Sequence, residues 1–240
     1  KEGPIDGVIG QVAIHLRDST EEEYDDISEQ HVDIGAEDGE AARSRVDVGD
    51  PITLTGRVTD LAGERIAARG IDNRVGIWTA AETFRRAVES NPKSTVYAVS
   101  TVQEEVGLKG AQMVGADLEP DAVVAVDVTH ATDGPDSPGD KGSDVDLGGG
   151  PVVSRGSANH PALVEAVRTV GDEAGIDLQL SATGSRTGTD ADAFYTSAGG
   201  IPSLNLGLPN RYMHTPVEVV DLGDLEAAAE LLAAFTTRAE

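Results

Sequence analysis

The chain has 240 residues, of which 43 are Asp or Glu and only 18 are Lys or Arg, so its formal net charge is −25. Such a charge repels nucleic-acid phosphates and anionic membranes, and it excludes both as expected partners. The absence of cysteine excludes disulfides, thiolate metal sites and cysteine nucleophiles, so any metal must be bound by oxygen and nitrogen ligands.

The acidic residues are spread along the whole chain rather than gathered in one tail. Concentrated salt shortens the Debye length to a few ångström and screens their repulsion, so we expect a protein from a halophile. A cation-binding acidic protein is the alternative. No apolar run is long enough to span a membrane and no signal-peptide pattern opens the chain, so the expected setting is cytoplasmic.

Two domains are predicted from the change in pattern along the chain. Residues 1–66 carry short β segments at 7–16 and 51–57, separated by turns and by the acidic run 18–29, which predicts a small β-rich domain. Residues 67–240 form the second domain.

In the second domain, amphipathic helices alternate with short apolar strands, which is typical of an α/β fold with a mostly parallel central sheet covered by helices. Helices are predicted at 74–90, 160–174, 190–198 and 222–238, and strands at 95–102, 122–126 and 203–208.

Carboxylates follow two of the predicted strands. Glu104 and Glu105 follow one apolar strand, and Asp127 follows the next. Because ligands of open α/β sheets bind outside the carboxyl ends of the strands, we expect these side chains to share a site. Neighbouring residues of an extended strand point to opposite faces, so both glutamates reach one site only if the chain turns near Gly107. Ordinary solvated surface is the alternative for the pair of glutamates.

Asp72 and His214 are two further candidates. Asp72 stands just ahead of the first predicted helix, where it serves either as a metal ligand or as a helix N-cap. His214 lies on a loop between two prolines, and imidazole together with carboxylates suits zinc, cobalt or manganese. His31 stands in a His-x-Asp sequence typical of metallopeptidases, but it falls inside the β-rich segment.

Six short segments occur in this order: Asp-Asn-Arg-Val-Gly (72–76), Gln-Glu-Glu-Val-Gly-Leu-Lys-Gly-Ala (103–111), Asp-Val-Thr (127–129), Gly-Gly-Pro-Val (149–152), Gly-Thr-Asp-Ala (188–191) and Arg-Tyr-Met-His-Thr-Pro-Val-Glu (211–218). This ordered set resembles the M42 (tetrahedral aminopeptidase-like) family of metallo-aminopeptidases. Residues 7–10, 33–36 and 49–50 are similar to the small β-barrel domain that is inserted into the family's catalytic domain and serves oligomerisation.

The resemblance implies a cytoplasmic metallo-aminopeptidase that removes N-terminal residues from short peptides with two divalent metal ions, zinc or cobalt, with manganese as a further option. It implies that Asp72 bridges the two ions, that Glu105 and Asp127 each bind one, and that His214 completes a site. Glu104 becomes the general base. The family's assembly implies a homo-oligomer, a hollow tetrahedral dodecamer.

One departure from the family pattern concerns a metal-binding histidine. The family places it upstream of the barrel insertion, whereas this chain begins within that insertion. Because the surroundings of His31 resemble the barrel, His31 is not expected to replace it. We expect the N-terminal portion of the catalytic core to lie in a longer protein; the alternative is a protein that lacks one ligand.

Two other functions stay open at this stage. A glycoside hydrolase could use the same carboxylates, although aromatic residues, at 3%, are scarce for sugar stacking. A non-catalytic acidic subunit could bind cations through the Gly/Asp/Pro-rich loop at 132–146.

Overall fold

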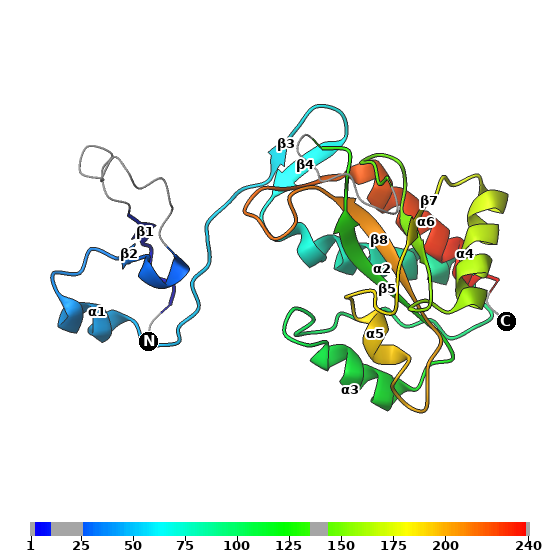
Figure 1. Ribbon diagram of the computed structural model, residues 1–240, viewed down its shortest axis with the longest axis horizontal. Helices are drawn as coiled ribbons and strands as arrows, with labels where there is room; N and C mark the ends of the chain where they lie inside the picture. Colours follow the sequence, from blue (N-terminus) through cyan, green and yellow to red (C-terminus); the bar gives the residue numbers. More distant parts are fainter. Residues whose placement is uncertain (1–2, 11–25, 135–143, 239–240) are drawn as a thin grey trace. The chain divides into compact units, whose positions relative to one another are not determined.

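The computed structural model describes residues 3–10, 26–134 and 144–238. The chain divides into two compact units, Lys1–Leu54 and Thr55–Glu240, which are described separately (Figure 1). The predicted division near Ala67 falls inside a strand of the larger unit, so the two-domain organisation with that boundary stays a prediction.

The smaller unit contains little regular structure. Strands β1 (Val8–Ile9) and β2 (Val32–Asp33) form an antiparallel pair, η2 (Ile27–Glu29) is a single 3-10 turn, and α1 is a helix at Gly39–Arg45. None of its described residues is buried, and they form no closed barrel.

Two of the β segments predicted in the N-terminal part differ from the structure. The segment at 7–16 lies partly outside the described residues; within its described part, 7–10, Val8 and Ile9 form β1. The segment at 51–57 forms no strand.

A four-stranded mixed sheet forms the centre of the larger unit. Its order is β5 (Val123–His130), β8 (Ser203–Asn210), β6 (Val152–Arg155) and β7 (Gln179–Ala182). The two outer pairs are parallel and the central pair, β8 with β6, is antiparallel. Every residue of β8 is buried, so this apolar strand is the middle of the core. The α/β prediction is confirmed, with a mixed sheet.

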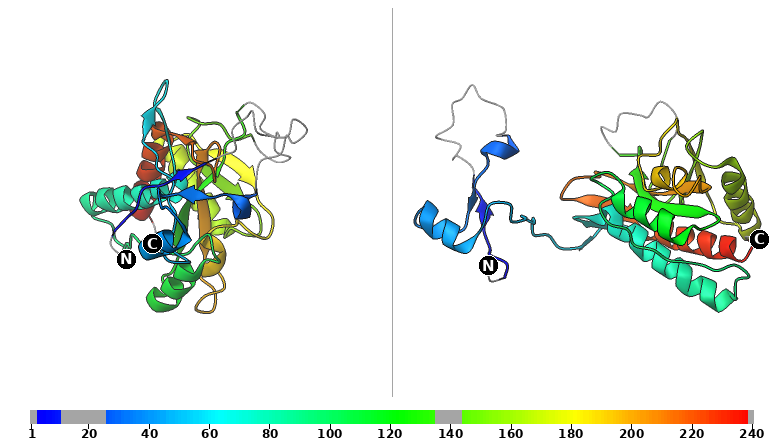
Figure 2. Two further views of the ribbon diagram at one scale, coloured as in Figure 1. Left: turned by 90° about the vertical axis from the view of Figure 1, so that its left-hand side faces the viewer. Right: turned by 90° about the horizontal axis from the view of Figure 1, so that it is seen from below.

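Helices cover this sheet. Helix α2 (Ile71–Ser90) lies alongside α6 (Leu222–Thr236), which also contacts α4 (Pro161–Ala174), as Figure 2 shows. Helix α3 (Lys109–Leu118) packs against the short α5 (Ala191–Phe194) and encloses a second, smaller apolar cluster. Within the described residues, no helix is long and apolar enough to cross a membrane.

A second, antiparallel sheet connects the segment before α2 with the segment before α6. Its order is β3 (Thr59–Asp60), β4 (Arg65–Ala68) and β9 (Glu218–Asp221), and Ala68 pairs with Glu218. Because β4 leads directly into α2, this register places Glu218 beside the first turn of that helix.

The structure corrects two strand predictions near the carboxylates. Residues 95–102 form no strand: among the described residues no strand pairs with them, and residues 95–101 line the same cavity as β5. Strand β5 continues to His130, so Asp127 lies within the strand rather than after it.

Candidate metal centre

Asp72 projects from an irregular first turn of α2. The helix begins at Ile71 after Gly70, but Asp72 and Asn73 leave helical geometry, and regular helix starts at Arg74, as predicted. The N-cap of α2 is Gly70, and no helix N–H of the described residues donates to the Asp72 side chain, so the N-cap interpretation is wrong. Asn73 fixes this turn, since its amide donates to the Val126 carbonyl at 2.8 Å and accepts from the Gly76 N–H at 3.0 Å.

Gly76 makes this close approach possible. A Cβ at this position would lie 2.5 Å from the Val126 carbonyl oxygen and 2.3 Å from the Asn73 side chain. Any larger residue would therefore push α2 away from the strand that carries Asp127.

Glu104 and Glu105 lie in a tight turn before α3. Gln103 has a φ of 62° and Gly107 a φ of 109°, and the Gly107 N–H donates to the Glu104 carbonyl at 3.0 Å. The chain therefore turns where the neighbouring glutamates require it, and both side chains line one cavity of about 1550 Å³.

The same cavity is lined by Asp72, Asp127 and Asp190. Asp127 is buried in β5, where the Val128 N–H donates to it at 2.8 Å. Asp190 precedes α5; one carboxylate oxygen accepts from the Thr101 hydroxyl, while the other is buried and has no hydrogen-bond partner among the described residues.

His214 comes from the loop between β8 and β9. An isolated bridge between Arg211 and Val219 closes this loop. His214 itself adopts a φ of 63°, a left-handed conformation that is costly for a residue with a Cβ. Such strain occurs where surrounding contacts hold a functional side chain in place.

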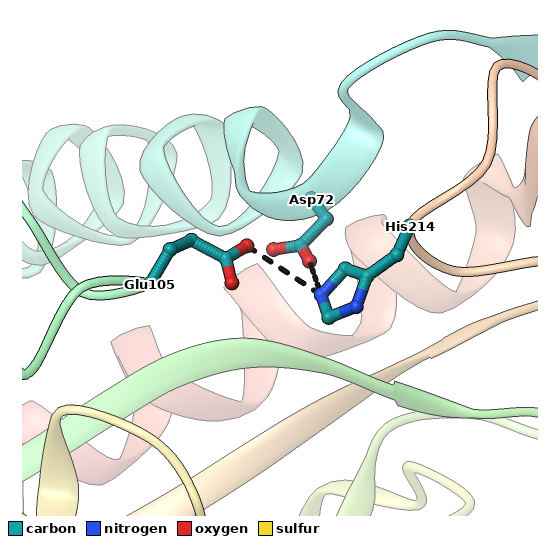
Figure 3. A group of neighbouring side chains, drawn as sticks. All are labelled: Asp72, Glu105 and His214. Atoms are coloured by element: carbon teal, nitrogen blue, oxygen red, sulfur yellow. Dashed lines mark ion pairs between the residues drawn. The ribbon is translucent and has the colours of Figure 1, made fainter. Parts of the chain in front are cut away.

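Asp72, Glu105 and His214 converge, and we call them the Asp72 cluster (Figure 3). The His214 Nε2 atom lies 3.0 Å from Asp72 Oδ2 and 3.5 Å from Glu105 Oε1. One potential ligand atom from each residue lies within 4.8 Å of the other two, and no other such trio occurs in the described part of the chain. Two oxygens and one imidazole nitrogen suit a divalent transition metal.

Burial raises the pKa of several carboxyls around the cavity. The pKa of Asp127 rises to about 7, mainly through burial, with the charges of Glu104 and Asp72 adding to the effect. The pKa of Glu104 also rises to about 7, through burial and then the charge of Glu105. Burial is likewise the largest cause of the raised pKa values of Asp72 and Asp190. This concentration of mutually repelling carboxylates fits positive ions as partners.

The structure thus brings together three of the predicted site residues and places the other two, Glu104 and Asp127, on the wall of the same cavity. The sequence prediction did not name Asn73, Asp190 or Glu218 as parts of the site. Glu218 is 1% exposed and accepts from the Ile71 N–H at 2.7 Å. Its signal in the sequence was its place at the end of the segment 211–218, which also carries His214. His31 belongs to the smaller unit.

Comparisons with known proteins agree on one family. The family model described as M42 glutamyl aminopeptidase matches residues 1–231. The chain is 32% identical over 239 residues to a lysyl aminopeptidase of Pyrococcus furiosus, covering 98% of this chain and 67% of that protein.

Solved structures show the same relationship. An aminopeptidase from the archaeon Desulfurococcus kamchatkensis has a TM-score of 0.87 at 32% identity, over 100% of this chain and 67% of the other. The Pyrococcus horikoshii TET1 peptidase, which can assemble into a tetrahedron or a large octahedral shell, has a TM-score of 0.85 at 32% identity, over 98% of this chain and 69% of the other. The chain belongs to the M42 family of aminopeptidases and is a peptide hydrolase.

Proposed function

We propose that this protein removes N-terminal residues from short peptides with two divalent metal ions, zinc or cobalt, or else manganese. The observation that carries the proposal is the convergence of the Asp72 cluster, two of whose members, Asp72 and Glu105, line a cavity together with further carboxylates. In the proposed arrangement Asp72 would be a ligand shared by both ions, Glu105 and Asp127 would each bind one, and His214 would complete a site. Such ions supply Lewis-acid activation of a water molecule and of a carbonyl group.

Glu104 is the proposed general base. Its carboxylate takes a proton from the attacking water and passes it to the nitrogen of the departing amine. A pKa raised to about 7 suits this role, because a base works best when its pKa is near the working pH.

Self-association is part of the proposal. A similar peptidase assembles into a tetrahedron or an octahedral shell, and we infer that this chain also forms a homo-oligomer, with the smaller unit, proposed to be part of a barrel-like insertion, taking part. The tetrahedral dodecamer, the halophilic source and the cytoplasmic setting stay predictions from the sequence.

The experiment is hydrolysis of a panel of amino-acid p-nitroanilides in molar KCl. We expect activity that disappears on chelation, returns with Zn²⁺ or Co²⁺, and falls roughly 100-fold to 10,000-fold in a Glu104→Gln variant. The variant should bind metal as the wild type does. A variant that stays active would remove Glu104 from the mechanism, and p-nitroanilide hydrolysis that survives chelation would favour a metal-free peptide hydrolase.

A further inference from the structure

A buried carboxylate ties together the backbones of two residues in the Asp72 cluster. Glu218, the first residue of β9, is 1% exposed. Its Oε2 atom accepts from the N–H groups of Ile71 and Asp72, at 2.7 and 3.4 Å, and its Oε1 atom accepts from the N–H of His214 at 3.2 Å. Each oxygen therefore holds a different segment of the chain.

The first of these segments needs an acceptor. The first N–H groups of a helix have no partner within the helix, and a negative charge near them is stabilising. Gly70, which precedes α2, has no side chain to supply such an acceptor, and the side chain of Asn73 accepts only from the N–H of Gly76, further along the helix. Glu218 fulfils this role from another strand, because the pairing of Ala68 with Glu218 brings β9 beside the helix start.

The second segment is strained. His214 has a φ of 63° and Tyr212 a φ of 60°, both in the left-handed region. Only surrounding interactions keep non-glycine residues there. The bond from the His214 N–H to Glu218 is such an interaction, and it fixes the backbone from which the imidazole reaches Asp72.

We propose that Glu218 is a positioning residue that sets the distance between the ligands Asp72 and His214. Both of its oxygens accept from backbone N–H groups, and through these bonds it holds the two ligand-bearing segments at a fixed separation. This inference rests on the proposed function, because it assigns Glu218 a role in the same metal site.

Asp224 provides a matched control. It is also 1% exposed and also accepts two backbone N–H bonds, from Gly148 at 2.8 Å and Gly150 at 2.7 Å. Those bonds hold a loop that carries none of the proposed ligands. Replacing either carboxylate by its amide removes the charge and turns one acceptor oxygen into a donor, so both changes disturb buried bonds.

The test compares Glu218→Gln with Asp224→Asn in the purified protein. Titration calorimetry measures Zn²⁺ and Co²⁺ affinity, the visible absorption of bound Co²⁺ reports ligand geometry, and urea unfolding reports stability. We expect Glu218→Gln to weaken metal binding roughly 10-fold to 100-fold, as loss of an outer-shell partner does, and to change the Co²⁺ spectrum. Asp224→Asn should lower stability with affinity and spectrum unchanged.

A Glu218→Asp variant keeps the test decisive if the amide variant does not fold. It retains the charge and both oxygens but is one methylene shorter, so it cannot reach both segments, and its affinity should lie between those of the wild type and Glu218→Gln. Wild-type affinity and spectrum in either Glu218 variant would overturn the inference alone. A wild-type protein that binds neither metal would instead overturn the proposed function together with this inference.

Discussion

Helix α2 carries acidic residues in two contrasting settings. On the side of the helix where Arg85 is exposed, the half-buried Glu82 accepts from Arg85 and Arg86, and these bonds lower its pKa to about 2. Arg86 also pairs with Glu226 of α6. At the start of the same helix, Asp72 has a raised pKa, because it is desolvated and lies beside Glu105. The same chemical group is thus stabilised as an anion in one place and destabilised in the other.

The contrast between the pKa values of Glu82 and Asp72 reflects where the few basic residues of this acidic chain lie. Around α2, arginines neutralise carboxylates on the surface, where such pairs contribute little to stability. Around the cavity, the nearest charges to Asp127 are other carboxylates, which raise its pKa further. Bound metal ions would neutralise these carboxylates as the arginines neutralise Glu82. Removing or restoring the metal therefore tests the contrast between the two regions of the helix.

The largest expected effect is the pH dependence of the metal-free protein. The pKa values of Asp127 and Glu104 rise to about 7 from ordinary values of 3.8 and 4.5. Between those values and pH 7 the folded state binds more protons than the unfolded state, so the free energy of unfolding falls as pH rises through this window. Urea unfolding with chelator at constant salt, from pH 4.5 to 8, measures it, and saturating Zn²⁺ should flatten the decline.

Asp127→Asn isolates one contributor to that decline. Removing this buried charge should stabilise the metal-free protein at pH 8 by on the order of 2–4 kcal/mol, since one pKa unit corresponds to about 1.4 kcal/mol. At pH 4.5 the two proteins should be nearly equally stable. An Asp127→Asn variant that is less stable than the wild type at pH 8 without metal would show that the carboxylate is already compensated.

The smallest effect is expected on the exposed side of α2. Glu82→Gln weakens two surface ion pairs, so the urea midpoint should fall slightly at low salt and hardly change in molar KCl, where the pairs are screened. Metal affinity and peptide hydrolysis should equal those of the wild type. A loss of metal binding in this variant would contradict the claim that the Glu82 region of the helix takes no part in the metal site.

The sequence predicted the proposed metal ligands better than the residues that position them. The identities of Asp72, Glu105 and His214 followed from the order of motifs, and the turn that presents the neighbouring glutamates followed from the need to bring both to one side. The alternation of helices and strands also predicted α2, α4, β8 and α6 closely. Local pattern sufficed because each of these elements is long or strongly apolar.

Long-range register accounts for what the sequence did not reveal. Glu218 acts on residues 146 and 147 positions away, through the pairing of two four-residue strands. Hydropathy would place a glutamate on the surface, yet this one is buried. Residues 95–102 have the apolar pattern of a strand, but no strand of the described residues pairs with them, and a local pattern cannot predict that. Segments 11–25 and 135–143, with most of the candidate cation loop at 132–146, lie outside the described residues.

The most direct test of the central claim is the metal content of the protein at equilibrium. Chelator-stripped wild-type protein and an Asp72→Asn variant would be dialysed against Zn²⁺ or Co²⁺, and bound metal would be counted by mass spectrometry after confirmation of folding by circular dichroism. The account predicts two ions per chain in the wild type and a clear loss in the variant, because Asp72 would bridge both. Equal metal content in the two proteins would contradict it.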